Sequence, residues 1–497
     1  MTGRRRRAPS RGRVLSSLFA VLLVVAGGLV AAVVSYQQHH AGGNPEPTPR
    51  TARPTLSASP APVVRTTAPA AWAVTPSPPT VALSAAGRLP SGQKPTGKGL
   101  AAMLAPRLAD PAFAGGAVSI VVGDPLTGTT VLNNGGGVEV LPASTAKLAV
   151  AAAALERLGP SHRITTRTAL TSDGRVVLVG AGDPTLAGPK ATGRLDPGFP
   201  EPARLADLAA RTASALKTRG VTHVRLGYDD SLFTGPAVAP GWKPTYITEG
   251  DVAPVSALEV DEGQPDLTRP ARTESPSAVA AGDFAALLSA AGVTVDGAPQ
   301  RVAAGPAPTL ASVDSPTMSA LVQRMLDRSD NDLAEALARQ VAIADGRPGS
   351  FTGGAQAVRD VISKLGVRAD GFEMVDGSGL SRTDRVRPIA LVQLVNLLLS
   401  PSHPEFSSAL QGLPVAGFSG TLASRYNSPP ALSASGLVRA KTGTLDGVVA
   451  LAGFAYDASG RVLSFAVVAN GIPNNATLRA EAALDRVGAG LAGCGCS

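Results

Sequence analysis

The sequence predicts an α+β fold with a segment inserted in its middle. Strand-like runs at residues 116–122, 448–456 and 461–470 stand near the two ends of the folded part, and helical stretches lie between them. Short strand-like runs and glycine- and proline-rich turns fill much of residues 161–305. This change of pattern predicts that the segment is an insert between the two parts of the fold. The chain has 497 residues, of which 44% are hydrophobic, so there is room for two or three compact units.

The first element is a basic tail followed by an apolar run. Residues 1–13 hold six arginines and no acidic residue, and the next 21 residues, Val14–Val34, carry no charge. A helix needs about 20 residues to cross a bilayer, and arginine-rich flanks stay in the cytoplasm. The sequence therefore predicts a cytoplasmic tail at 1–13 and a single membrane anchor at 14–34, with the rest of the chain outside the cell membrane. A cleaved signal peptide is the alternative interpretation.

Residues 35–96 are predicted to form a linker. Twelve of the chain's 42 prolines fall between Asn44 and Lys98, among serine, threonine and alanine. Because such a stretch has no periodic hydrophobic face to bury, it is expected to stay extended.

The formal net charge of +8 suggests nucleic-acid binding until the charges are located. Residues 1–13 account for +6 and residues 35–100 for +5, so the remaining residues are mildly acidic. An acidic body has no electrostatic attraction for phosphate, and we therefore expect no nucleic-acid partner.

The folded part begins with strands at Gly116–Val122 and Thr129–Leu132 and a helix at Ser144–Leu158. Further helices are predicted at Arg204–Lys217, Ser277–Ala291, Met318–Leu326, Asp332–Ala344, Gly354–Leu365 and Ala476–Val487, and further strands at Arg175–Val179, Leu437–Ala440, Val448–Tyr456 and Arg461–Asn470. The last two strands are expected to form an antiparallel hairpin. Cys494 and Cys496 match no zinc or redox spacing and are expected to lie outside the core.

Ser144-Thr145-Ala146-Lys147 begins the first long helix. The i, i+3 spacing places Ser144 and Lys147 on one face, and a neutral amine beside a hydroxyl can activate it as a nucleophile. Burial near the amino end of an apolar helix would lower the pKa of the lysine in the required direction. The pattern is common, however, and a helix cap with a solvated lysine is the plainer interpretation when it stands alone.

Two further patterns carry polar groups suited to catalysis. In Ser329-Asp330-Asn331, between two predicted helices, the hydroxyl can relay a proton to a leaving amine and the Asn331 amide can bind a substrate amide. Lys441-Thr442-Gly443-Thr444 stands at the end of a predicted strand, where glycine admits a substrate backbone and the lysine and threonines suit a carboxylate. A helix cap and a strand-to-turn junction are the respective alternatives.

In this order, Ser-x-x-Lys, Ser-Asp-Asn and Lys-Thr-Gly form the motif set of penicillin-binding proteins and serine β-lactamases. The flanking segments resemble more narrowly the D-alanyl-D-alanine carboxypeptidase/endopeptidase family of penicillin-binding protein 4 (peptidase family S13). These segments are Leu141-Pro142-Ala143, Leu178–Leu186, Pro254–Leu258, Leu333-Ala334-Glu335, Asp376–Arg382, Leu413–Gly417, Gly420-Thr421-Leu422 and Ala440–Leu445. The resemblance covers roughly residues 97–475.

The resemblance implies a β-lactamase/transpeptidase-like domain, an antiparallel sheet flanked by helices, at residues 97–160 and 306–493. An inserted domain at 161–305 would separate the first two motifs. The implied substrates are peptidoglycan stem peptides, β-lactam antibiotics would acylate the same serine, and no metal or organic cofactor is implied.

The resemblance also assigns roles. Ser144 would attack the carbonyl between the two terminal D-alanines, with Lys147 as general base. Ser329 would pass a proton toward the leaving amine, and Asn331 would hold the acyl side of the substrate. Lys441, Thr442 and Thr444 would bind the terminal carboxylate, with Gly443 also in the substrate-binding set. The backbone N–H groups of Ser144 and Thr444 would form the oxyanion hole.

Two other interpretations are compatible with these motifs. A serine β-lactamase is disfavoured by the predicted anchor, the long insert and the lack of a Glu-x-x-Leu-Asn segment. A catalytically idle wall-binding protein is disfavoured by the intact Ser144, Lys147 and Lys441. The five histidines serve neither a Gly-x-Ser-x-Gly elbow nor a His-Glu-x-x-His zinc motif. The balance between carboxypeptidase and endopeptidase activity stays open.

Overall fold

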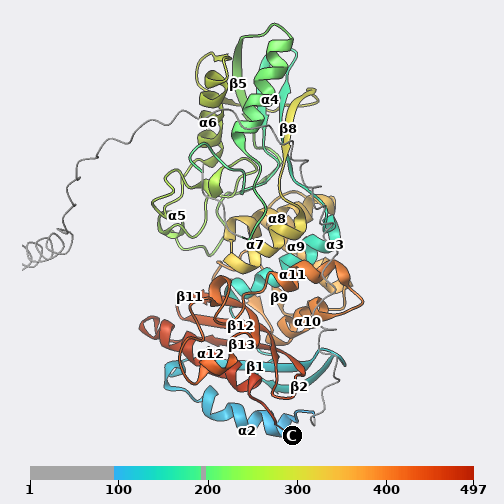
Figure 1. The fold of residues 1–497 in the computed structure, drawn as a ribbon, viewed down its shortest axis with the longest axis vertical. Coiled ribbons are helices and arrows are strands. Elements are labelled where there is room, and N and C mark those ends of the chain that lie inside the picture. The colour runs from blue at the N-terminus through green and yellow to red at the C-terminus, as the bar shows by residue number, and fades with distance from the viewer. Residues whose placement is uncertain (1–93, 192–197, 497) are drawn as a thin grey trace, which may run out of the picture. The chain divides into compact units, whose positions relative to one another are not determined.

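The computed structural model describes residues 94–191 and 198–496 (Figure 1). The predicted tail at 1–13, the predicted anchor at 14–34 and nearly all of the predicted linker at 35–96 lie outside these residues. Within the described part, no helix combines the length and the apolar character that crossing a membrane requires.

A five-stranded antiparallel sheet joins the beginning of the described chain to its end. In spatial order its strands are β11 (Val438–Leu445), β12 (Val448–Tyr456), β13 (Val462–Asn470), β1 (Ala117–Asp124) and β2 (Thr129–Asn134). The link is the antiparallel pairing of β1 with β13, in which Ala117 lies opposite Asn470. This sheet and its helices confirm the predicted α+β class.

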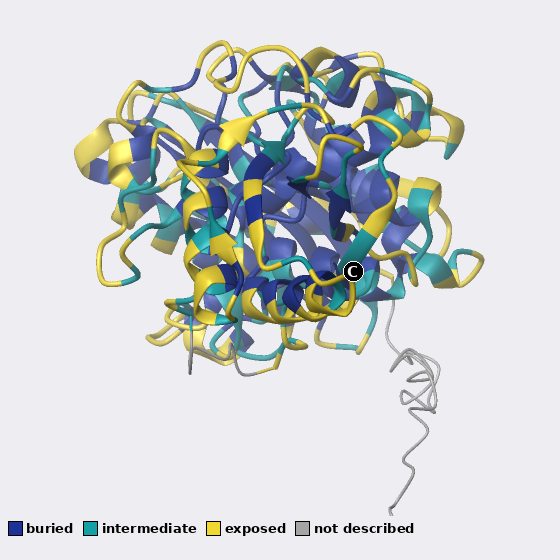
Figure 2. Cartoon of the chain, turned by 90° about the horizontal axis from the view of Figure 1, so that it is seen from above, coloured by how far each residue is buried: buried dark blue, intermediate teal, exposed yellow. Residues whose placement is uncertain are grey.

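Helices cover both faces of the five-stranded sheet. On one face lie α2 (Gly97–Leu108) and α12 (Thr477–Ala492), and on the other lies α10 (Pro388–Leu399), backed by α3 (Lys147–Leu158). The side chains of β12 alternate between the two layers: Val449 and Leu451 join the α12 cluster, while Ala450 and Ala452 join the α3 cluster. The buried residues accordingly gather in the interior (Figure 2).

A group of helices packs against α3 on the side away from the sheet. Its members are α7 (Met318–Arg328), α8 (Asn331–Ala344) and α9 (Phe351–Lys364), with the short α11 (Ser407–Gln411) against α7. The helix predicted from Ser144 starts later: residues 143–146 form a 3-10 turn, and regular α-helix begins at Lys147.

The insert carries its own six-stranded mixed sheet. Its strands are β6 (Thr294–Val295), β5 (His223–Asp229), β4 (Arg175–Val179), β3 (Thr165–Leu170) and β8 (Thr309–Asp314) in spatial order, with β7 (Gln300–Arg301) beside β5. Helices α4 (Leu205–Thr218) and α6 (Pro276–Ala290) pack on it. The short α5 (Tyr246–Glu249) and a small ribbon of β9 (Phe372–Glu373) with β10 (Arg385–Val386) are the remaining α-helix and strands of the described residues, which also contain short 3-10 helices. The strand β8 lies past residue 305, where the sequence placed the end of the insert.

The end of the chain differs from the prediction. Helix α12 runs on to Ala492 instead of ending at Val487, and this extra turn carries the tail against α2. Cys494 is therefore only 2% exposed and belongs to the cluster of α2 and α12, so the expectation that both cysteines lie outside the core is wrong. Cys494 and Cys496 form a disulfide, and the Thr96 N–H donates to the Cys496 carbonyl at 2.8 Å.

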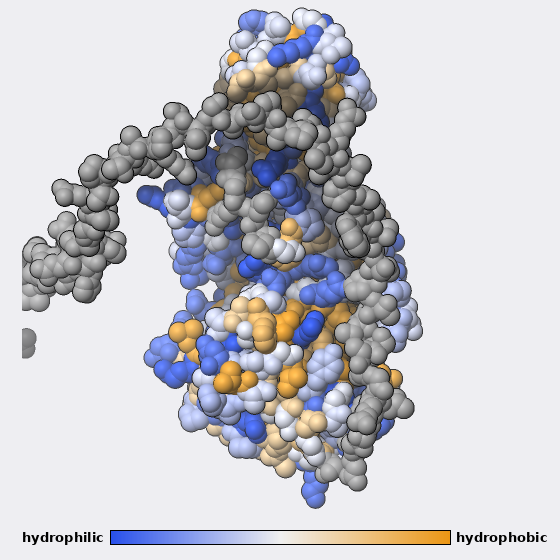
Figure 3. Space-filling view, viewed as in Figure 1, coloured by the Kyte–Doolittle hydropathy of each residue, from blue (hydrophilic) through white to orange (hydrophobic). Residues whose placement is uncertain are grey.

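The visible surface mixes hydrophilic and hydrophobic side chains, with hydrophobic ones exposed mainly over the part that contains the five-stranded sheet (Figure 3). Large exposed hydrophobic residues of that part include Phe418, Leu432 and Leu478. Isolated apolar side chains are usual on folded domains, so we infer no function from them.

Asp183 provides a stability prediction, because it is a buried carboxyl with one satisfied oxygen. Oδ1 accepts from the N–H and the hydroxyl of Thr185, whereas Oδ2 has no hydrogen-bond partner among the described residues. Burial raises the pKa of Asp183 to about 6 from an ordinary 3.8. The native state thus holds a proton that the unfolded state releases, and this group should cost about 3 kcal/mol of stability as pH rises from about 4 to about 7.

Asp183→Asn should remove this dependence. Urea unfolding at several pH values should show the variant gaining stability over wild type as pH rises. The exposed Glu156→Gln serves as the control and should follow the wild-type profile. A constant difference between Asp183→Asn and wild type from pH 4 to pH 7 would contradict the assignment.

Candidate active site

Ser144 lies in the 3-10 turn that precedes α3, and Lys147 is the first residue of the helix. The Lys147 Nζ donates to the Ser144 Oγ at 2.8 Å, so the predicted pair is in contact. Ala143, just before the serine, has a φ of 47°, a left-handed conformation that is uncommon outside glycine. The nucleophile turn is therefore held in a strained shape, as is frequent at functional sites.

Lys147 is fully buried, and its amine has three acceptors from three segments. Besides Ser144, these are the Asn331 Oδ1 at 2.7 Å and the backbone carbonyl of Ser378 at 2.7 Å. Burial lowers the pKa of Lys147 to about 8, although Asp376 and Glu335 oppose the shift. About a tenth of the amine is then neutral at pH 7. The neutral amine can donate to Asn331 and Ser378 while its lone pair accepts the proton of Ser144.

The Ser329-Asp330-Asn331 segment forms the tight turn between α7 and α8. Ser329 ends α7 with a φ of 59°, and the Asp330 carboxylate caps α8 by accepting from the Leu333 N–H at 2.9 Å. The Asn331 amide donates to the backbone carbonyl of Asp251 at 2.7 Å, in addition to its contact with Lys147. In this structure both ends of the amide are thus occupied by the protein.

The Lys441-Thr442-Gly443-Thr444 segment lies inside β11, which continues to Leu445, so its predicted place at the end of a strand is corrected. Since β11 is the edge of the five-stranded sheet, no described strand lies along its outer side, which is bridged only near its start, where Val415 pairs with Arg439. A Cβ on Gly443 would meet the Pro142 carbonyl at 2.8 Å, which explains why glycine stands beside the nucleophile turn. Lys441 is fully buried, and burial together with the nearby Lys147 holds its pKa well below the usual value.

The two threonine hydroxyls of this strand have partners that the sequence did not indicate. The Thr442 Oγ1 lies 2.8 Å from the Thr421 Oγ1, and the Thr444 Oγ1 donates to the Glu481 Oε1 at 2.6 Å. Thr421 stands in one of the segments used for the family resemblance, whereas nothing in the sequence pointed to Glu481 on α12.

A cavity of about 550 Å³ opens onto these groups. Its lining includes Ser144, Ser329, Asn331, Thr442 and Thr444, while Lys147, Lys441 and Gly443 lie behind that surface. A hydroxyl with a partly neutral amine beside it, a second hydroxyl and a set of hydrogen-bond donors suit nucleophilic acyl transfer.

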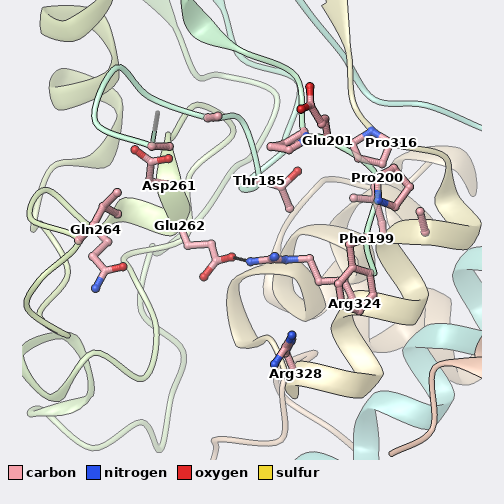
Figure 4. Close-up of a pocket in the computed structure, with 16 residues that line it drawn as sticks. Thr185, Phe199, Pro200, Glu201, Asp261, Glu262, Gln264, Pro316, Arg324 and Arg328 are labelled. Atoms are coloured by element: carbon pink, nitrogen blue, oxygen red, sulfur yellow. Dashed lines mark hydrogen bonds and ion pairs between the residues drawn. The ribbon is translucent and has the colours of Figure 1, made fainter. Parts of the chain in front are cut away.

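A second cavity, of about 430 Å³, lies on the α7 side of the insert and does not include Ser144 (Figure 4). Arg324 reaches Glu262 in it, as the figure shows. Oxygens of Glu262, Asp330 and Asp332 lie within 4.8 Å of one another, a spacing that could hold a cation. Arg324 pairs with Asp330 at 3.2 Å and Arg272 with Asp332 at 3.6 Å, so guanidinium groups already supply positive charge there.

Comparison with known proteins gives consistent matches. Residues 100–271 and 266–491 match the model of the D-Ala-D-Ala carboxypeptidase 3 (S13) family. The chain is 38% identical over 436 residues to carboxypeptidase DacB of Mycolicibacterium smegmatis, covering 86% of this chain and 91% of that protein. It is 30% identical over 467 residues to the D-alanyl-D-alanine carboxypeptidase of an Actinomadura species, covering 76% and 82%.

The fold is similar to that of penicillin-binding protein 4 (dacB) from Haemophilus influenzae. The TM-score is 0.61 at 22% identity, over 75% of this chain and 93% of that one. A structure of the same protein complexed with a novel beta-lactam gives a TM-score of 0.56 at 23% identity, with the same shares of the two chains.

Gly379 generates a prediction about the nucleophile turn. It has a φ of +81°, and a Cβ there would meet the Ala143 carbonyl at 2.1 Å. Gly366 has a φ of +87° with nothing within 4 Å of a Cβ, so it is a matched control. Each change to alanine costs about 1 kcal/mol of left-handed strain. Gly379→Ala should lose about 2 kcal/mol more through the clash. Urea unfolding measures both, and equal losses would contradict the close contact.

Proposed function

The chain belongs to the D-Ala-D-Ala carboxypeptidase 3 (S13) family and is a serine-type D-Ala-D-Ala carboxypeptidase, and from this premise we propose that Ser144 is its nucleophile. The observation that carries the proposal is the 2.8 Å contact between the Lys147 Nζ and the Ser144 Oγ, at the floor of a cavity shared by all three motifs. The substrates are peptidoglycan stem peptides that end in D-Ala-D-Ala.

The acylation step follows from the positions of these groups. The Ser144 Oγ attacks the carbonyl between the two D-alanines as its proton passes to the neutral Lys147 amine. The oxyanion is stabilised by the backbone N–H groups of Ser144 and Thr444. As the tetrahedral intermediate collapses, the C–N bond breaks and Ser329 relays a proton to the leaving amine of D-alanine. Water then hydrolyses the ester, which returns the serine hydroxyl and releases the shortened peptide.

The cavity also offers groups for orienting the substrate. Thr442 and Thr444 present hydroxyls to the terminal carboxylate, and the buried Lys441 lies behind them on the same strand. Asn331, which also lines the cavity, would hold the acyl side of the peptide by exchanging its contact with the Asp251 carbonyl.

Endopeptidase activity on cross-linked peptides is the second candidate, and one feature favours it. A further cavity of about 270 Å³ shares Ser424, Arg425 and Glu481 with the site cavity. This adjacent space on the Thr444 side gives room for a leaving group larger than D-alanine.

We also propose that residues 14–34 hold the protein at the cell membrane as a single-pass anchor, with the catalytic body outside. The support is the uncharged run behind an arginine-rich tail, together with the extracytoplasmic place of peptidoglycan.

The central test compares wild type with Ser144→Ala. Each is incubated with a peptide ending in D-Ala-D-Ala and, separately, with a penicillin, and products are followed by mass spectrometry. Wild type should release D-alanine and carry a stable penicilloyl group, and the variant should do neither. Equal activity in Ser144→Ala would refute the nucleophile. Rapid penicillin hydrolysis without peptide cleavage would favour a β-lactamase, and no reaction of wild type would favour the wall-binding alternative.

Glu481 provides a prediction about affinity. Its carboxylate occupies the Thr444 hydroxyl that the substrate carboxylate requires. Glu481→Gln removes a negative charge that would repel the terminal carboxylate of the substrate. For a partly solvated contact this repulsion is about 1 kcal/mol of binding free energy. The KM for a D-Ala-D-Ala peptide should therefore fall several-fold while kcat stays the same. As control, the inhibition constant of the C-terminally amidated peptide should not change; an equal gain for both ligands would contradict charge competition.

A further inference from the structure

The acceptor that Ser378 offers to Lys147 is a backbone carbonyl, so its position depends on the conformation of the chain around it. It belongs to the loop of residues 376–381, here named the 376–381 loop. Every residue of this loop, from Asp376 to Ser381, is buried. What holds this loop therefore also holds one of the three acceptors of the general base.

Glu335 binds the 376–381 loop from α8. Its carboxylate accepts from the Gly377 N–H at 3.0 Å and from the Ser378 N–H at 2.8 Å, and the side chain is only 1% exposed. Two backbone donors on one buried carboxylate are charge-assisted contacts of the stronger kind. They fix the peptide groups that immediately precede the Ser378 carbonyl.

The position of Glu335 on its helix explains how the geometry arises. Asn331 and Glu335 are four residues apart on α8 and so lie on one face. Asn331 contacts the Lys147 amine directly, and Glu335 contacts it through the Ser378 carbonyl. One face of one helix thus sets two of the three acceptors of Lys147.

Other groups hold the rest of the loop, and Glu335 supplies the hydrogen bonds that join the Gly377 and Ser378 N–H groups to α8. Asp376 accepts from the Gly379 N–H and the Ser381 N–H, each at 2.8 Å, and from the Trp242 indole at 2.7 Å. These bonds define the turn and tie it to the insert. Gly377 meets α8 so closely that a Cβ would lie 2.6 Å from the Ala334 carbonyl.

We propose that Glu335 is a positioning residue for acyl transfer: it presents the Ser378 carbonyl to Lys147 and so keeps the amine directed at Ser144. The inference rests on the proposed function of Ser144. Glu335 does not touch the substrate, and it acts only through the 376–381 loop.

The charges around the lysine give the proposal a distinctive signature. Lys147 is faced by Asp332 and Glu335 from α8, by Asp330 from the turn before that helix, by Asp376 from the loop and by Lys441 from β11. Burial, followed by the neighbouring Asp376, raises the pKa of Glu335 itself to about 7. In its charged form Glu335 raises the pKa of Lys147, so its removal should shift the pH at which the base becomes neutral.

The experiment uses the full chain and follows acylation by a fluorescent penicillin in stopped flow from pH 5 to pH 10. Glu335→Gln keeps the size of the side chain but removes the charge, which weakens the two bonds that hold the Gly377 and Ser378 N–H groups. We expect the acylation rate constant to fall roughly tenfold to a hundredfold through misplacement of the base. The non-covalent affinity for penicillin should stay within about twofold. The acid limb of the pH–rate profile, where the rate rises as Lys147 loses its proton, should move about one pH unit lower.

Asp384→Asn is the matched control. Asp384 is buried beside the same loop and accepts from the Val375 N–H, and its pKa is well above the usual value because of burial and Asp376. The substitution changes a neighbouring hydrogen bond, and Asp384 is not among the carboxyl groups that raise the pKa of Lys147, which are Asp376, Glu335, Asp330 and Asp332. Its acid limb should coincide with that of wild type even if its stability falls.

Two results would overturn the proposal. One is Glu335→Gln with the rate and pH profile of wild type; the other is a loss of rate that Asp384→Asn reproduces together with the same shift of the acid limb. If Glu335→Gln does not fold, Glu335→Asp decides, since it keeps the charge but shortens the reach: its rate should fall with the acid limb in place, and a wild-type rate would refute positioning. Failure of the proposed function itself is recognised separately, because wild type would then not be acylated.

Discussion

The Lys147 amine lies out of reach of solvent, and much of the structure follows from the need to satisfy it. A buried ammonium without acceptors is prohibitively unstable, so Ser144, Asn331 and Ser378 must converge on one nitrogen. These three residues come from the turn before α3, the start of α8 and the 376–381 loop, which are far apart in the chain. Burial lowers the fraction of the amine that is charged, and these acceptors make the buried amine tolerable, so reactivity and stability depend on the same enclosed position.

Helix α8 is the element that coordinates this arrangement. Asp332 accepts from the Ala253 N–H of the insert, and the buried Arg339 donates to the backbone carbonyls of Thr234 and Gly349. The insert is therefore fastened to the same helix that carries Asn331 and Glu335. Its Asp251 carbonyl even touches the Asn331 amide, which makes the insert part of the wall of the site and not a distant appendage.

The sequence was sufficient to select motif residues that the structure brings to one cavity, and to predict most long elements, because periodicity and motif order are properties of residue type. It predicted β12 at its observed bounds and α7, α8 and α9 within a few residues, but it missed β3 and β5, whose short runs mix polar with apolar residues. The Ser378 carbonyl could not be assigned a role, since every residue has a carbonyl and only the fold selects one. Glu481 reaches Thr444 from α12, a separate element 37 residues further along the chain, and Cys494 is buried only because α12 is longer than its pattern indicated.

The contact between Thr96 and Cys496 has a mechanical consequence. The two ends of the described body meet at α2 and α12, on the face of the five-stranded sheet opposite α10. Leu100 and Leu104 of α2 are fully buried in that layer. A pull on the chain ahead of residue 94 would thus act first on α2 and its hydrophobic contacts with α12. The nucleophile and its base lie in the layer on the other side of the sheet. The enzyme can be held under tension at one face and keep the geometry of its acyl-transfer groups at the other.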